Sequence, residues 1–151
     1  MPALGTGTMP DFVQDLLAVQ NPLTLKLAIF VGAFLLAASS ALVRPSLAAT
    51  LLKSIQQSPG VIHATGAVTA FAGGGLLVVH TDFSSITAAL VTLTAIWWAI
   101  EGLGMLAIGH LLKIATPSAI RAYALSNIPA LIIGAFLIIA GLAGHAPELT
   151  P

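Results

Sequence analysis

The amino-acid sequence predicts an all-α polytopic membrane protein: a four-transmembrane-helix bundle with both termini on the extracytoplasmic side and short amphipathic interfacial helices. Three observations predict this fold. Of the 151 residues, 58% are hydrophobic and only 7% are charged, whereas a soluble domain carries about 25% charged residues. The apolar residues form four runs, each long enough to cross a bilayer as a helix. Most of the charged residues lie in the connections or near the ends of these runs.

Four spans are expected within one transmembrane domain, residues 23–144. Their predicted bounds are about 23–43, 61–79, 86–112 and 119–144. The link between the second and third spans is short, so these two spans should be antiparallel neighbours. Pro129 lies inside the fourth span and predicts a kink there, because proline lacks the amide proton that a helix needs.

Two shorter amphipathic helices are expected outside the spans. In the N-terminal extracytoplasmic segment, residues 1–22, apolar side chains recur at helical spacing and indicate a helix at the membrane surface. A loose tail is the alternative for this segment. The connection 44–60 carries a second such pattern, with an apolar face formed by Leu47, Leu51, Leu52 and Ile55. The C-terminal tail is residues 145–151.

The charges predict the orientation of the spans. The cations Arg44, Lys53, Lys113 and Arg121 flank the connections after the first and third spans, whereas Lys26 is the only cation on the opposite side. Because cytoplasmic loops carry an excess of Lys and Arg, loops 44–60 and 113–121 are expected in the cytoplasm. The small size and the lack of an evident targeting segment favour the bacterial inner membrane.

A short pattern of small residues occurs twice. Gly66-Ala67 followed by Ala72-Gly73 recurs as Gly134-Ala135 followed by Ala140-Gly141, at the same spacing. Duplication of a two-helix hairpin would give such a parallel repeat. Coincidence is the alternative in a chain so rich in alanine and glycine.

Several function classes are disfavoured by composition. The formal net charge is zero and no basic patch is present, so no nucleic-acid partner is expected. The chain has no cysteine, which excludes thiolate metal sites and cysteine nucleophiles. We find no phosphate-binding loop, nucleophile elbow or acidic pair, and therefore predict no enzyme, no catalytic residue and no metal site.

Glu101 is the main candidate site residue, because it is the only acid within the four spans. It should lie about 15 Å from the cytoplasmic end of its helix, where an ionisable group is costly. The polar residues expected in the same half of the bundle are Asn127, Tyr123, Ser40 and His63. The other half is expected to be nearly bare of polar groups. Three interpretations stay open: a proton or ion relay, a structural hydrogen-bond cluster, and a contact with another protein.

The histidines and tryptophans supply weaker candidates. His63 with His110, or His80 with His145, could ligate haem b axially. All four lie near span ends, where interfacial histidines are the simpler interpretation, and no cofactor is predicted. Trp97 and Trp98 lie in mid-span and could line a quinone, carotenoid or lipid site, or simply pack against other helices.

The sequence therefore favours a small non-catalytic subunit or accessory protein of a larger inner-membrane complex, contributing helix packing and assembly. Its expected partners are the lipid bilayer and other integral membrane subunits, or further copies of itself. The first alternative is a small homo-oligomeric transporter or channel with Glu101 as the proton- or ion-coupling group. The second alternative is a haem- or quinone-binding redox membrane anchor.

Overall fold

The computed structural model of this chain describes residues 21–111 and 114–144. Within these ranges all regular structure is helical, as the sequence predicts. The α-helices are α2 (Pro22–Leu42), α3 (Pro45–Gln57), α4 (Pro59–Val79), α5 (Ile86–Ile108) and α6 (Pro117–Ala143), and a short 3₁₀ helix, η1 (Gly109–Leu111), extends α5. The predicted N-terminal interfacial helix, the C-terminal tail and Lys113 lie outside the described residues.

Four of the helices are long and apolar enough to cross a membrane: α2, α4, α5 and α6. They fall on the four runs expected from the sequence. In three of them a polar N-cap directly precedes a proline at the first helical position, and its side chain accepts a backbone hydrogen bond from the first turn. These starts are Asn21-Pro22, Ser58-Pro59 and Thr116-Pro117. Pro129 does not interrupt α6.

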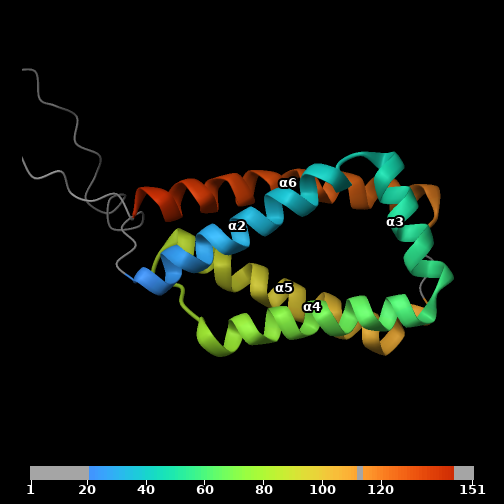
Figure 1. The fold of residues 1–151 in the computed structure, drawn as a ribbon, viewed down its shortest axis with the longest axis horizontal. Helices are drawn as coiled ribbons and strands as arrows, with labels where there is room; N and C mark the ends of the chain where they lie inside the picture. The colour runs from blue at the N-terminus through green and yellow to red at the C-terminus, as the bar shows by residue number, and fades with distance from the viewer. Residues whose placement is uncertain (1–20, 112–113, 145–151) are drawn as a thin grey trace, which may run out of the picture.

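The long helices pack as two pairs (Figure 1). α4 packs along α5, and α2 packs along α6, while contacts between the two pairs are fewer. At one end of the bundle α3 runs across from α2 to α4 and contacts both α6 and α4 (Figure 1). We call this the α3 end. The opposite end, where α4 ends at His80, is called the His80 end.

Glycines let the helices of each pair approach closely. A Cβ atom on Gly102 of α5 would overlap the backbone of Ala70 and lie 2.6 Å from the carbonyl oxygen of Gly66 on α4. A Cβ atom on Gly32 of α2 would lie 2.7 Å from the carbonyl oxygen of Gly134 on α6. Each pair is therefore joined where two glycines meet, as is common between membrane helices.

The repeated glycine pattern has the same role in both pairs. Gly66 and Gly73 of α4 both face α5, and Gly134 and Gly141 of α6 both face α2. Consider α2 and α4 as the first half of the chain, and α5 and α6 as the second half. The second helix of the first half, α4, then packs on α5, and the second helix of the second half, α6, packs on α2.

The two pairs meet in a small apolar core. Its fully buried members are Ala28 and Val31 of α2, Val91 of α5 and Leu137 of α6. On the α3-end side of this core the rings of Phe34 and Trp98 meet edge to face, with centroids 5.0 Å apart. Trp98 thus packs within the bundle, one of the two roles considered for it.

Helix α3 buries only part of its predicted apolar face. Leu52 and Ile55 are buried together with Ala48, whereas Leu47 and Leu51 are exposed. The difference arises because α3 lies across the end of the bundle and touches it along one narrow stripe. The side chain of Gln56 accepts a 2.7 Å hydrogen bond from the backbone of Ala115, which attaches α3 to the segment before α6.

Candidate functional site

Glu101 lies on α5 toward the α3 end and is half-buried. Its carboxyl group interacts with the indole of Trp97, one turn earlier on the same helix, and lies in electrostatic range of the Tyr123 hydroxyl on α6. Glu101 and Tyr123 are at matching depth, each about 10 Å from the end of its helix by the rise per residue. The carboxylate therefore has one polar neighbour on its own helix and one from the other pair.

The other predicted members of this polar cluster are placed differently. The side-chain amide of Asn127 donates a 2.8 Å hydrogen bond to the backbone carbonyl of Tyr123. Ser40 is exposed and its hydroxyl donates to the carbonyl of Ala37 in its own helix. His63 is exposed at the start of α4. The structure thus brings Tyr123 within electrostatic range of Glu101, whereas no hydrogen bond among the described residues joins Asn127, Ser40 or His63 to it.

One face of α5 around Glu101 is open to its surroundings. Trp97, Glu101, Gly104 and Ile108 follow one another at helical spacing, and we call them the Glu101 face. Trp97 is 66% exposed and Ile108 is also exposed. A Cβ atom on Gly104 would meet nothing within 4 Å. The Glu101 face therefore combines a carboxylate with an uncovered aromatic ring and an unfilled position between them and Ile108.

A second polar cluster lies at the His80 end. The imidazole of His80 is only 4% exposed, and both of its nitrogens contact threonine hydroxyls. Nε2 lies 3.0 Å from Oγ1 of Thr24 on α2. Nδ1 lies 3.1 Å from Oγ1 of Thr92 on α5. Thr24 and Thr92 are themselves buried, so three elements meet at one histidine.

The hydrogen bonds of Thr92 identify the tautomer of His80. The Thr92 hydroxyl donates to the backbone carbonyl of Asp82 at 2.9 Å, and accepts from the backbone amide of Asp82 at 3.2 Å. A hydroxyl has one proton. With that proton on Asp82, Nδ1 of His80 donates to Thr92, and in the neutral ring Nε2 then accepts from the Thr24 hydroxyl. The neutral Nδ1–H tautomer satisfies every member of the cluster.

The expectation of a half of the bundle nearly bare of polar groups is wrong. Buried polar side chains at the His80 end are Thr24, His80, Ser85, Thr87 and Thr92. The sequence places His80 at the end of a span, where an interfacial position is the usual interpretation. It does not show that two threonines distant in sequence are turned toward it. The one signal in the sequence is that a threonine lies in the first part of each of two different spans: Thr24 in the first and Thr92 in the third.

The link next to this cluster holds a stabilised carboxylate. The backbone amide and the side chain of Ser84 hydrogen-bond to Asp82, and these bonds hold the pKa of Asp82 below its ordinary value. Desolvation raises the pKa but does not cancel the effect of these bonds. Asp82 therefore stays ionised beside the buried histidine.

The haem hypothesis finds only part of its ligands among the described residues. His63 is exposed, and both ring nitrogens of His80 are hydrogen-bonded. The side chain of His110 and the whole of His145 lie outside what the structure describes. Within the described ranges, no group of three His, Cys, Asp or Glu residues could hold a metal ion.

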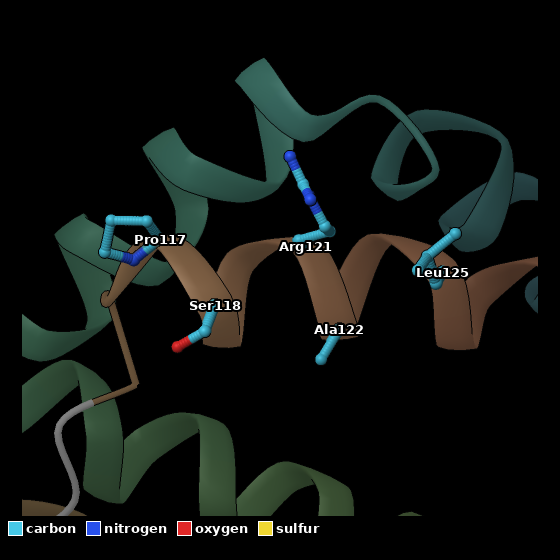
Figure 2. A pocket seen from close by; sticks show the side chains of 5 residues that line it. All are labelled: Pro117, Ser118, Arg121, Ala122 and Leu125. Atoms are coloured by element: carbon cyan, nitrogen blue, oxygen red, sulfur yellow. The ribbon is translucent and has the colours of Figure 1, made fainter.

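A shallow depression lies at the start of α6 (Figure 2). All five lining residues belong to this one helix: Pro117, Ser118, Arg121, Ala122 and Leu125. Figure 2 shows Ser118 and Ala122 on one side of the helix and Arg121 directed toward α3. The depression is an open helix surface, and it contains none of the predicted site residues.

Comparison with known proteins does not assign the chain to a family. No protein-family model matches the chain, and no curated protein or solved structure matches it either. The candidate function therefore rests on the Glu101 face and the His80 cluster.

Proposed function

We propose that this chain is a non-catalytic integral subunit or accessory protein of a larger bacterial inner-membrane complex, and that it binds its partner through the Glu101 face. The observation that carries the proposal is the half-buried Glu101 carboxylate beside a Trp97 ring that is 66% exposed. An ionised acid at the centre of a membrane helix costs about 3 kcal/mol on insertion scales. A partner helix with a hydrogen-bond donor would offset that cost.

The shape of the Glu101 face supports a helix as the occupant. Small residues at membrane helix interfaces allow close approach, and the position of Gly104 is unfilled. The glycines at the two helix contacts are already covered inside the bundle, whereas Gly104, like Gly74 and Gly75 of α4, is not. Trp97 and Ile108 would then pack on either side of the incoming helix.

The orientation is part of the proposal. Arg44, Lys53 and Arg121 all belong to the α3 end, while Asp82 lies at the His80 end with Lys26. By the positive-inside rule the α3 end is cytoplasmic, and both termini are extracytoplasmic. Reporter fusions test this: a reporter active only in the cytoplasm should be silent when fused to the C-terminus.

Affinity purification in mild detergent tests the subunit proposal. The tagged full chain is expressed in its natural host, and the co-purifying membrane proteins are identified. We expect a partner to co-purify with the wild-type chain. The amount of this partner should fall with Glu101→Gln, and the partner should be absent with Glu101→Leu. Leu103→Ala is the matched control, because Leu103 is exposed at the same depth on a different face. The proposal is contradicted if the chain elutes alone, or if the same amount of partner co-purifies with every variant.

We propose, as a second candidate, a small homo-oligomeric transporter in which Glu101 couples to a proton or ion. The observation that favours it is the buried polar cluster at the His80 end, because a pathway needs polar groups on both sides of its central acid. Thr92 of that cluster and Glu101 lie on the same helix, separated by about 14 Å along its axis. Ion flux into liposomes that contain the purified chain tests this candidate. Absent flux, or flux unchanged by Glu101→Gln, would exclude it.

A further inference from the structure

We propose that His80 is a proton-operated latch between the two helix pairs, closed when its imidazole is neutral and released when the ring is protonated. The proposal is independent of the function of the Glu101 face. It rests on how the pairs are joined, on the hydrogen bonds of the ring and on its burial.

The two pairs are suited to move as separate bodies. Within each pair the helices meet at glycines, where backbone touches backbone along much of their length. Between the pairs contacts are fewer, and they include the small core around Val31 and Val91. A packed pair moves as a unit more readily than it deforms, because its interior is close-packed. The weaker boundary between pairs is where the bundle can open.

The bond between His80 and Thr24 crosses that boundary. Thr24 belongs to the α2–α6 pair, whereas His80 and Thr92 belong to the α4–α5 pair. Among the described residues, it is the one side-chain-to-side-chain hydrogen bond that joins the two pairs. At the α3 end the pairs are connected differently, through α3 and its Gln56. At the His80 end, next to the apolar core, the hydrogen bond that joins the two pairs is therefore made by a titratable residue.

Protonation acts directly on this bond. In the neutral ring Nε2 accepts the proton of the Thr24 hydroxyl, as the tautomer requires. A proton added at Nε2 reverses this bond: Nε2–H becomes the donor and the Thr24 oxygen the acceptor, so the buried Thr24 hydroxyl proton loses its partner. The new imidazolium is held by two neutral hydroxyls in a site that is 4% exposed. Burying a charge without a hydrogen-bonded counter-ion is unfavourable, and separation of the pairs would admit water to the ring.

Among the described residues, no carboxylate forms a hydrogen bond with the ring. Asp82, on the link after His80, attracts the imidazolium, but its side chain is bonded to Ser84. Lys26 of α2 is exposed at the same end and would repel it. The acid of α5, Glu101, and the ionisable groups in the described part of α6, Arg121 and Tyr123, lie toward the α3 end. Acidification is therefore expected to open the His80 end.

Distance measurements between spin labels test the latch. The chain has no cysteine, so labels can be attached to engineered pairs without background. Leu23→Cys with Val78→Cys reports across the boundary, and Val78→Cys with Leu93→Cys reports within the α4–α5 pair; all three positions are exposed. From about pH 8 to about pH 5, where histidine titrates, the first distance should lengthen and the second should stay constant.

His80→Gln is the matched control for titration, because glutamine keeps hydrogen-bonding capacity but takes up no proton in this range. In this variant both distances should be independent of pH. Nitrogen NMR of histidine, with His80 assigned by its loss in the variant, should show protonated Nδ1 at the upper pH and a charged ring at the lower pH. Four results would each overturn the latch: a neutral ring throughout, an Nε2–H tautomer, a charged ring with unchanged distances, or the same lengthening in His80→Gln.

Discussion

Nε2 of His80 lies 3.0 Å from Oγ1 of Thr24, and this contact joins the end of α4 to the beginning of α2. Both residues are buried, so neither polar atom can be satisfied by bulk water if its partner is removed. The hydrogen bond therefore contributes to stability as well as to the placement of the two helix pairs.

Replacing Thr24 by valine should destabilise the fold. The variant keeps the shape of the side chain but leaves Nε2 of His80 without its donor, which costs about 1–3 kcal/mol. Thr24→Ser keeps the hydroxyl and should lose much less. Denaturant unfolding in detergent micelles measures both variants. Equal losses for valine and serine would contradict a role for the hydroxyl.

Adding one methyl group at Gly102 should disturb the α4–α5 pair. The new Cβ atom would overlap the backbone of Ala70, and backbone cannot rotate away as a side chain can. We expect Gly102→Ala to lose about 1–3 kcal/mol of unfolding free energy, the usual cost of overpacking. Gly74→Ala is the control, because a Cβ atom there meets nothing within 4 Å. The same assay should show Gly74→Ala close to wild type.

Filling the open position on the Glu101 face should block partner binding without harming the fold. Gly104→Leu adds a side chain where the chain itself leaves space, so thermal unfolding in detergent should remain near that of wild type. Co-purification of the partner should be lost. A stable Gly104→Leu variant that retains its partner would place the interface elsewhere on the protein.

The carboxyl group of Asp82 should contribute to the pH dependence of stability. Its pKa is lowered in the folded state by the hydrogen bonds of Ser84. The stabilisation is therefore present above the unfolded-state pKa and is lost as the pH falls through the lower folded-state pKa. Ser84→Ala keeps the backbone amide and removes the hydroxyl. It should therefore raise the pKa of Asp82 toward its ordinary value without restoring that value fully. Carboxyl NMR titration of wild type and variant measures this difference.

The number and position of the membrane-crossing helices could be predicted from the sequence, because length and hydropathy determine which segments can cross a bilayer. The helix starts could be predicted as well, since Ser58-Pro59 and Thr116-Pro117 combine a side-chain cap with a proline suited to the first turn. These features depend on neighbouring residues alone.

The faces of the helices could not be predicted in the same way. A helix that is apolar all round gives no amphipathic pattern to show which side meets protein and which meets lipid. Ser40 and His63 were therefore expected in the polar cluster around Glu101, although both are exposed. The burial of His80 was missed for the same reason, because only the packing of three helices turns Thr24 and Thr92 toward it.

The meeting of Gly32 with Gly134 has a consequence for biosynthesis. The first described membrane helix packs on the last one, so α2 enters the bilayer long before its partner has been translated. Until then its glycine face is covered by lipid or by another protein. α4 and α5, by contrast, are neighbours in sequence and can pair as soon as both have been inserted. A ribosome stalled before α6 would thus leave one complete helix pair and one unmatched helix in the membrane.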